Sequence, residues 1–430
     1  MSDKDIFQLV CSEVFNCAKK HFNYDESPEC ADECICKALS WITLSNSPPL
    51  RILGQKLIRR GLLLSSYHVP IVEEILLRID GCEPTVLLEL FTDSPPSDHI
   101  LQYLLPYWPK IRKHFIQLLD SQFSHTTEEE AGKIQDIFKF WKRCFKAAMA
   151  ARDHLTSVLI CLLNETVALL RGIWDINAPA VSLLGCIKLL QKFVEIVCYD
   201  TWTFGLKPKR LDIADAHLYD EALSLLIDLK SKFRIPPTSN VEYFKSEKFE
   251  QLFIYVTART LYVYGGQHEL LASWLSIEAD KIIELYAEDD VLLFRILITL
   301  LMIENMHLKS LGKNKSSIPS AHDLFASILK WINFDRHIII DWLVSPETDC
   351  LTYLLAYTKR LGAASNEEMT AEQRDLWRPS TKWLEKHREN VNKLLTEIVQ
   401  SLITLNNANS LPFSPELLIA NINKATKVLL

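Results

Sequence analysis

The sequence is long, balanced in composition and mildly acidic. Its 430 residues are 48% apolar and 23% charged, which is ordinary globular usage, and the formal net charge is −7. This charge predicts no general attraction to nucleic acid or to an anionic membrane surface. Because the chain has only 11 glycines and few alternating strand patterns, its composition favours helices.

Cysteine usage indicates the cellular compartment. The eleven cysteines mostly fall within apolar helical runs, where a free thiol behaves as a small hydrophobic side chain. Met1 is followed by polar and acidic residues and not by the basic and then apolar segment of a secretion signal. An odd number of cysteines without such a signal predicts a reducing, intracellular compartment.

The most apolar run, Val291–Met306, raises the question of a membrane span. It is interrupted by Arg295, closed by Glu304, and shorter than the roughly 20 residues that a bilayer requires. We therefore expect a buried core helix and no association with a membrane.

Residues 1–122 form the first predicted block of helices. Most of its helices are preceded by a Pro, Asp or Ser start signal. The predicted helices are Asp3–Phe22, Ala31–Leu44, Pro49–Leu64, Val69–Ile79, Pro84–Phe91 and His99–Leu119. Pro106 and Pro109 should break or kink the last of them, because proline lacks a backbone donor and clashes with the preceding turn.

Residues 123–308 form a central block of long apolar helices. The predicted helices are Ile134–Ala151, His154–Trp174, Pro179–Cys198, Ala214–Arg234, Val241–Tyr264, Glu269–Ala287 and Asp289–His307. The second and third are apolar nearly all round, which predicts buried helices in the middle of a stack. Residues 309–320 follow as an exposed basic loop.

Residues 321–364 contain a helical hairpin with a strongly marked turn. Two apolar helices, Ile338–Val344 and Leu351–Leu361, are separated by Ser345-Pro346-Glu347-Thr348-Asp349. Pro346 cannot continue the first helix but suits the first turn of the second, with Ser345 as its side-chain cap. Glu347 and Asp349 would then lie at the positive end of the helix dipole.

Residues 365–430 form the C-terminal helices. Trp383–Leu405 is amphipathic, and Ser414-Pro415-Glu416 marks a second helix start that runs to Leu430. Helices in successive pairs without a repeat of fixed period predict an all-α fold, an irregular armadillo- or HEAT-like α-solenoid of stacked helix pairs. A compact multilayer helical domain is the alternative.

Motifs that would carry chemistry are incomplete. His268-Glu269 begins like a metalloprotease helix, but Ala272 occupies the position of the second ligand. Gly312-Lys313 lacks the earlier glycine and the preceding strand of a phosphate-binding loop. The chain has no nucleophile elbow or dinucleotide-binding turn. We expect no enzymatic activity, no cofactor and no small-molecule substrate, and an enzyme whose site is assembled from distant residues is the remaining alternative.

The densest group of metal-ligand residue types is Glu29–Cys36. Cys30 and Cys34 would share one helix face and Cys36 follows, but no second pair stands at zinc-finger spacing. Cys11, Cys17 and His21 are the residues that would complete such a site in space. Ordinary helix-face cysteines are the favoured interpretation, so we expect no metal.

A short basic cluster could direct nuclear import. Lys207, Lys209 and Arg210 lie in an irregular segment, and an import receptor with acidic and aromatic grooves could take their side chains. A solvated loop is the favoured interpretation. Trp202 and Phe204, just before the cluster, are expected to be buried.

Two segments resemble the Lines protein family, the segment-polarity regulators and their animal homologues. In the hairpin the matching residues are Asp341, Leu343, Ser345, Pro346, Glu347, Thr348, Asp349, Leu351, Tyr353, Leu354, Leu355 and Tyr357. Leu411–Leu418 is similar to the Pro-flanked aromatic motif that closes Lines proteins, with Pro412, Phe413 and Pro415 as its marks. Thr358, before Lys359-Arg360, departs from the usual continuation. Together the segments cover a small part of the chain.

The resemblance implies a non-enzymatic regulator in the nucleus and cytoplasm. Its partners would be proteins, transcription regulators among them, in developmental signalling that includes the Wnt type. No catalytic or ligand residue carries over, and we expect the hairpin to be a packing element and not a direct partner contact. A structural subunit of a larger trafficking or chromatin assembly is the alternative function.

Overall fold

The structure is a computed structural model, and it describes most of the chain after residue 100. The described residues are 104–121, 128–150, 156–176, 180–197, 216–233, 247–264, 268–311, 318–364 and 370–430, together with Leu101 and Gly266. All regular elements in these ranges are helices, and no strand occurs among them. The predicted all-α class of stacked helices is therefore confirmed.

The chain divides into two compact units, which we describe separately. The first comprises Met1–Ile196 and Ile213–Phe244, and the second comprises Val197–Asp212 and Lys245–Leu430. The five predicted segments were defined by sequence signals, whereas these two units are defined by contacts. The predicted division therefore stays a prediction. Of the first segment, residues 1–122, only the last helix is described.

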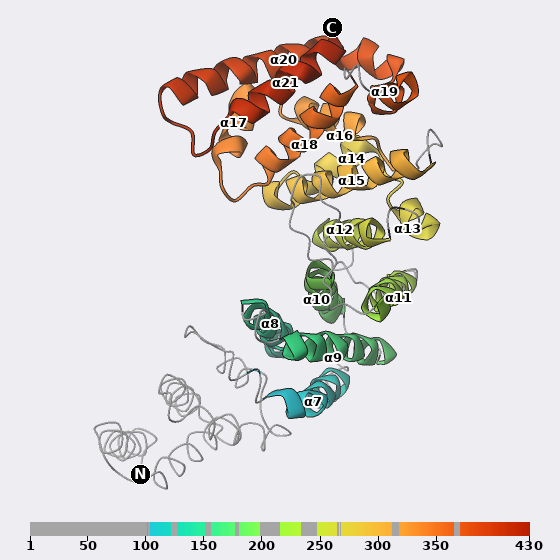
Figure 1. Ribbon diagram of the computed structural model, residues 1–430. Coiled ribbons are helices and arrows are strands. Elements are labelled where there is room, and N and C mark those ends of the chain that lie inside the picture. The colour runs from blue at the N-terminus through green and yellow to red at the C-terminus, as the bar shows by residue number, and fades with distance from the viewer. Residues whose placement is uncertain are drawn as a thin grey trace, which may run out of the picture. The chain divides into compact units, whose positions relative to one another are not determined.

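The first unit is a stack of apolar helices around one central helix (Figure 1). Its described elements are η2 (Leu105–Tyr107), α7 (Trp108–Ser121), α8 (Glu128–Ala150), α9 (Thr156–Asp175), α10 (Ala180–Val197) and α11 (Ala216–Phe233). Helix α9 packs against α7, α8 and α11. The turn η2 contains Pro106 and separates α7 from the preceding residues, as the prolines predict.

Aromatic side chains fill the core between α7 and α8. Trp108, Phe115, Phe140 and Trp141 are all fully buried, with ring centroids 5.2–6.3 Å apart. Trp141 Nε1 donates to Thr166 Oγ1 of α9 at 2.7 Å. This bond satisfies the indole in the core, since a buried polar group without a partner would be destabilising.

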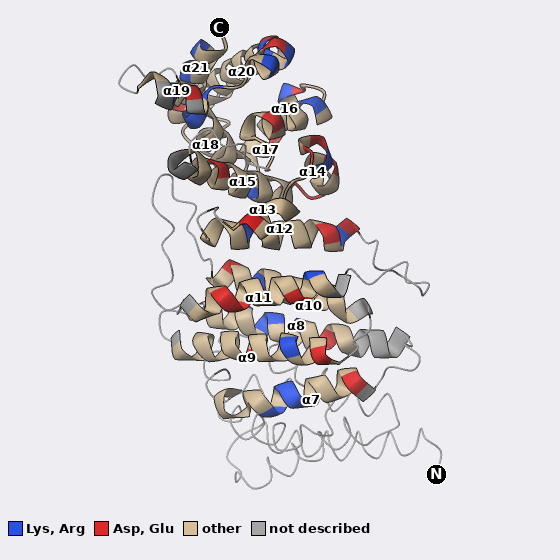
Figure 2. Cartoon of the chain, turned by 90° about the vertical axis from the view of Figure 1, so that its right-hand side faces the viewer, with Lys and Arg blue, Asp and Glu red and all other residues tan. Residues whose placement is uncertain are grey.

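The second unit contains the remaining described helices. They are α12 (Glu247–Val263), α13 (Glu269–Trp274), α14 (Ala279–Tyr286), α15 (Asp290–Leu311), α16 (Ala321–Trp331), α17 (Arg336–Val344), α18 (Cys350–Ala363), α19 (Ala371–Trp377), α20 (Thr381–Asn407) and α21 (Glu416–Leu429). Helix α15 packs against α12, α14, α16 and α18, while α20 contacts α16, α17 and α21. Acidic and basic residues alternate along several of these helices (Figure 2).

Two helices in the described ranges are long and apolar enough to cross a membrane by length and composition alone. They are Ser157–Asp175 in α9 and Asp290–Leu308 in α15, and 56% of each apolar window is buried within the protein. In α15 the two interrupting charges are paired, Arg295 with Asp349 and Glu304 with Arg360. These contacts agree with the predicted core helix.

Two predicted elements of this unit differ from the structure. The single helix predicted over Glu269–Ala287 is wrong, because Leu275–Glu278 interrupts it between α13 and α14. The predicted loop starts too early, since α15 continues to Leu311. Asp289 caps the start of α15, because its Oδ1 accepts from the Leu292 N–H at 3.1 Å.

Candidate functional site

The Lines-like hairpin consists of α17 and α18, but its turn differs from the predicted one. Ser345 is the C-terminal cap of α17, its N–H bonded to the Asp341 carbonyl at 3.1 Å, and α18 begins only at Cys350. The prediction that Ser345 caps the second helix and Pro346 opens it is therefore wrong. Pro346 and Glu347 are exposed in the turn.

Two side chains of the turn explain the late start of α18. Thr348 Oγ1 donates to the Trp342 carbonyl at 2.6 Å, which ties the turn to the end of α17. Asp349 makes no side-chain cap, and its Oδ2 instead accepts from Arg295 Nε of α15 at 3.3 Å. Thr348 and Asp349 therefore make contacts that would be lost if the turn were helical.

The two tyrosines of the Lines-like segment lie in the core. Tyr353 and Tyr357 are at most 2% exposed and their rings stack 6.2 Å apart. Tyr357 also packs on Phe325 of α16, with ring centroids 4.1 Å apart. Burial raises the pKa of both phenols, so both stay neutral and act as core side chains.

His322, at the start of α16, joins three elements through polar contacts. Its Nδ1 lies 3.1 Å from the Tyr357 hydroxyl and its Nε2 lies 3.2 Å from the Trp377 carbonyl. Because a carbonyl can only accept, Nε2 carries the proton and Nδ1 accepts from the tyrosine. Burial, and then the charge of Arg360, lower the pKa of His322 to about 3, so the imidazole is neutral.

A buried ion pair lies beside this histidine. Arg360 Nη1 donates to Glu304 Oε2 at 2.5 Å, and the side chains are 3% and 13% exposed. The same carboxylate oxygen accepts from the Ala321 N–H at 2.8 Å, at the positive end of α16. The guanidinium also lies over the Trp377 ring, 5.3 Å from its centroid. The pair therefore holds α15, α16 and α18 together.

The helices that carry parts of the two Lines-like segments pack together. Helix α21 begins within the closing motif, at Glu416, and packs along α18 in an extensive contact. Gly362 allows this close approach, because a Cβ there would lie 3.0 Å from Lys424 Cβ. Of the motif itself, Pro412 is exposed, Phe413 is half-buried and Pro415 is the buried N-cap residue of α21.

Other candidate residues fall outside the described part of the chain. The basic cluster Lys207, Lys209 and Arg210 lies there, and so do Trp202 and Phe204. The same is true of the potential metal ligands Cys11, Cys17, His21, Cys30, Cys34 and Cys36. Within the described ranges, no three His, Cys, Asp or Glu side chains are placed to hold a metal ion.

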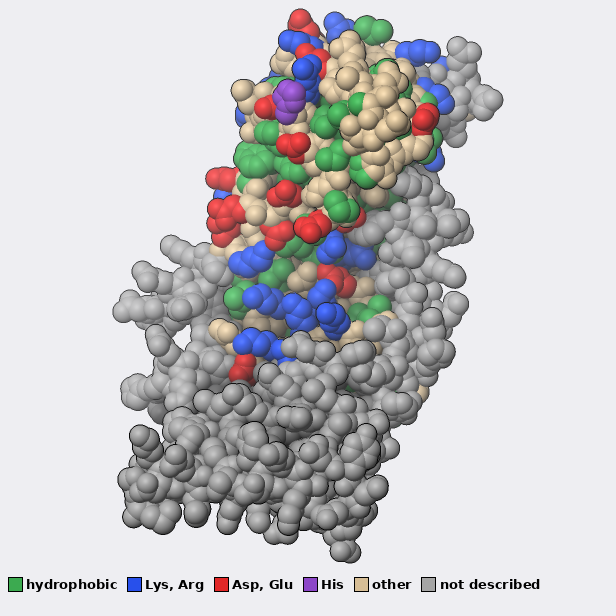
Figure 3. All heavy atoms as spheres, turned by 90° about the vertical axis from the view of Figure 1, so that its left-hand side faces the viewer, with side chains coloured by type: hydrophobic (Ala, Val, Ile, Leu, Met, Phe, Trp, Pro, Cys, Tyr) green, Lys and Arg blue, Asp and Glu red, His purple; other side chains and the backbone are tan. Residues whose placement is uncertain are grey.

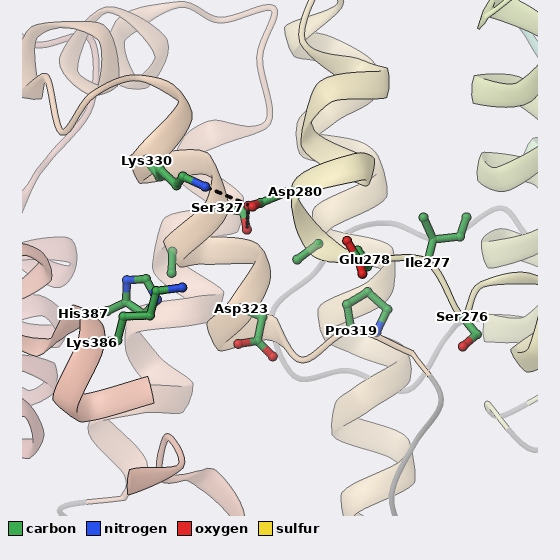
Figure 4. A pocket seen from close by; sticks show the side chains of 12 residues that line it. Ser276, Ile277, Glu278, Asp280, Pro319, Asp323, Ser327, Lys330, Lys386 and His387 are labelled. Carbon is green, nitrogen blue, oxygen red and sulfur yellow. Dashed lines mark hydrogen bonds and ion pairs between the residues drawn. The ribbon is translucent and has the colours of Figure 1, made fainter. Parts of the chain in front are cut away.

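An open cleft of about 420 Å³ in the second unit gathers charged and polar side chains (Figure 4). Residues from α14, α16 and α20 contribute to it. The acidic ones are Glu278, Asp280 and Asp323, and the basic or polar ones are Ser327, Lys330, Lys386 and His387. Ser327 and Lys330 of α16 point toward Asp280 of α14, while Lys386 and His387 come from α20 (Figure 4).

Hydrogen bonding stabilises the charged form of Asp280 in the cleft. Ser327 Oγ donates to Asp280 Oδ1 at 2.6 Å and Lys330 Nζ contacts Oδ2 at 3.1 Å. These bonds, the serine first, lower the pKa of Asp280. Burial and the charge of Lys386 lower the pKa of His387. The cleft thus offers an ionised carboxylate, ammonium groups and a neutral imidazole.

This arrangement suits binding better than proton transfer. The Asp280 carboxylate is stabilised in its charged form and is a weak base at neutral pH, and the Ser327 hydroxyl already donates to it. General acid–base catalysis favours a group that titrates near the working pH. Fixed charges of both signs instead match a partner surface of mixed charge.

Sequence reasoning missed the cleft. Its residues come from helices separated by up to about a hundred positions, and each alone resembles an ordinary solvated charge. The available signal was the helical spacing of Asp323, Ser327 and Lys330, which places three polar groups on one face of α16.

No protein-family model and no curated protein matches this chain. Among solved structures, it is similar to a circular tandem repeat protein with novel repeat topology and enhanced subunit contact surfaces. The identity is 12% and the TM-score 0.32, over 93% of this chain and 95% of the other.

Proposed function

We propose that this chain is a non-enzymatic, Lines-like helical scaffold that regulates transcription and developmental signalling of the Wnt type by binding proteins. The packing of α18 on α21 supports this most directly. Because α18 and α21 each carry part of one Lines-like segment, their packing supports treating the two segments as one unit. The proposal includes transcription regulators as partners, action in the nucleus and cytoplasm, and no cofactor or substrate.

The buried tyrosines of the Lines-like hairpin are not available to a partner, so a partner would bind to other surfaces. Tyr353 and Tyr357 are enclosed in the core and cannot meet a partner without unfolding. The cleft between α14, α16 and α20 is open and carries both signs of charge. We assign the partner contact in the second unit to this cleft, with Lys386 as an exposed basic group at its edge.

The experiment is affinity purification of the tagged full chain from nuclear extract, with quantitative mass spectrometry. Transcription regulators should be recovered with the wild-type chain and be depleted with Lys386→Glu, which reverses one charge in the cleft. Lys427→Glu, on the exposed surface of α21, is the matched control and should recover them normally.

The alternative function gives a different result. A fixed stoichiometric complex without any transcription regulator would overturn the proposal in favour of a structural subunit of a trafficking or chromatin assembly. Equal recovery with Lys386→Glu and Lys427→Glu would remove the cleft from the proposal but leave the scaffold function intact.

Nuclear import needs its own test. Replacing Lys207, Lys209 and Arg210 by Ala in a fluorescently tagged chain should reduce the nuclear fraction, since an import receptor reads the charges. Unchanged nuclear localisation would show that the basic cluster is an ordinary loop.

A further inference from the structure

The first unit contains a small groove between α8 and α10 that the proposed function does not use. Its volume is about 260 Å³. The lining residues lie on one face of each helix. They are Gln135, Phe138, Lys139 and Lys142 on α8 and Leu184, Gly185, Lys188 and Leu189 on α10. On each helix the lining residues recur at a spacing of three or four positions, so the groove runs along α8 and α10.

The floor of the groove is apolar and shaped by a glycine. Phe138, Leu184 and Leu189 supply its carbon surface, and Leu184 is half-buried. A Cβ at Gly185 would lie only 2.2 Å from the Phe138 ring, far inside contact distance. Because residue 185 is a glycine, the Phe138 ring can lie against α10. Gly185 is half-exposed, and it has no side chain that would fill the groove.

The rim of the groove is basic. Lys139, Lys142 and Lys188 are all exposed. Asp136 pairs with Lys139 at 2.8 Å, whereas Lys142 has no ion-pair partner among the described residues. Figure 3 shows several basic side chains gathered next to apolar ones on one face of the molecule. In a chain of net charge −7, this local excess of positive charge stands out.

The basic surface continues beyond the groove. Lys146 lies one helical turn after Lys142 on α8, and Lys192 lies one turn after Lys188 on α10. Lys146 is exposed, while Lys192 is half-buried and pairs with Glu195. The rim thus presents a row of positive charge along the groove and not a single cation.

We infer that this groove binds an acidic, amphipathic segment of a partner protein. An apolar side chain of the segment would enter the floor at Phe138 and Leu184, and its carboxylates would meet Lys142 and Lys188. The inference deepens the proposed scaffold function and rests on it, since it names the chemistry of one partner.

A nucleic acid fits this surface less well. Sequence or strand recognition needs polar groups for base edges or aromatic faces for stacking, and the floor offers mainly aliphatic surface around one largely buried ring. The groove matches the helix-in-groove mode, in which apolar anchors every third or fourth residue enter a hydrophobic floor.

The test uses the full chain and a fluorescein-labelled synthetic helical peptide of Glu and Leu, with Leu at every third or fourth position. Fluorescence anisotropy should show saturable binding that weakens as salt is raised. The double variant Lys142→Glu/Lys188→Glu should weaken binding by about tenfold or more, since it replaces attraction by repulsion. Leu184→Ser should weaken it separately by removing floor contact.

The control reverses the same number of charges elsewhere. Lys113→Glu/Lys427→Glu changes two exposed lysines, one on α7 and one on α21, and should leave binding unchanged. Circular dichroism should show the same helicity for all variants, because every changed lysine is exposed. A peptide with Ser in place of Leu should bind weakly even to the wild-type chain.

Several outcomes would overturn the inference. They are no saturable binding, equal loss in the groove and control variants, or tighter binding of duplex DNA or of anionic phosphatidylserine vesicles than of the peptide. If nuclear extract still yields transcription regulators while the peptide fails to bind, only the groove assignment fails. If peptide binding holds but no regulator is recovered, the wider proposed function fails instead.

Discussion

Helix α16 has two faces with similar chemical groups in opposite surroundings. On the inner face His322 is 6% exposed and contacts Tyr357 and a backbone carbonyl. On the outer face Ser327 and Lys330 form bonds to Asp280 that are open to solvent. The inner contacts join helices, and the outer ones remain accessible to a partner.

The two ion pairs of this region sharpen the contrast. Arg360–Glu304 is almost completely enclosed, whereas both side chains of Lys330–Asp280 are at least 60% exposed. A buried charge that loses its partner is strongly destabilising, while an exposed pair contributes little. Burial, and not the residue type, therefore separates structural groups from groups available for binding.

The largest expected effect is the removal of Arg360. In Arg360→Ala the Glu304 carboxylate stays 13% exposed without its guanidinium, and we expect the free energy of unfolding to fall by about 3 kcal/mol. Urea denaturation followed by circular dichroism measures the change. Glu304→Gln, which can still accept from the Ala321 N–H, should lose less than Glu304→Ala. Arg360→Ala with the urea midpoint of the wild type would contradict the structural role of the pair.

The second effect is a dependence of stability on pH. The folded-state pKa of His322, about 3, lies below the ordinary value of 6.5, so only the unfolded chain takes up a proton between these values. Stability is therefore complete above about pH 6.5 and is lost as pH falls, by about 2 kcal/mol down to pH 5. Urea denaturation across this range measures the slope. The slope should become shallower in His322→Gln, with a remainder from His387, whose pKa is also lowered, and an unchanged slope there would assign it to another group.

The third effect compares two tyrosines in one stack. Tyr357→Phe removes the hydroxyl that donates to His322 Nδ1, and we expect a loss of about 1 kcal/mol in the free energy of unfolding. Tyr353 has an equally buried ring, but its hydroxyl makes no hydrogen bond within the described residues. Tyr353→Phe is thus the matched control, and its urea midpoint should stay close to that of the wild type. Equal losses would show that the histidine contact contributes nothing.

The smallest effect is expected on the outer face. Lys330→Ala breaks the exposed pair with Asp280 and should change the free energy of unfolding by no more than about 0.5 kcal/mol. The same urea titration used for Arg360→Ala checks this. A loss as large as that of Arg360→Ala would remove the distinction between the two faces of α16.

Local sequence signals located most helices but not their ends. The apolar runs His154–Trp174 and Pro179–Cys198 correspond closely to α9 and α10, because a helix buried on most sides needs apolar residues all round. The break between α13 and α14 was not predicted. Helices α13 and α14 each pack against α12, and the Tyr286 hydroxyl at the end of α14 donates to the Gln251 carbonyl of α12 at 2.5 Å.

The hairpin turn illustrates the same limit. Pro346 marks the end of α17 correctly, since its ring excludes a continuing helix. Asp349 is the N-cap residue of α18 but makes no side-chain cap, and its carboxylate accepts from Arg295, 54 positions earlier in the chain. A partner so distant in sequence leaves no local signal.

Periodicity and proline are local properties, so the sequence alone predicts the all-α class and the approximate course of the longest described helices. The packing of α18 on α21, the enclosure of His322 and Arg360, the cleft and the basic groove arise only from tertiary contacts. These features depend on which helix faces meet. A side chain's burial, charge state and availability are fixed by neighbours that the chain brings together only on folding.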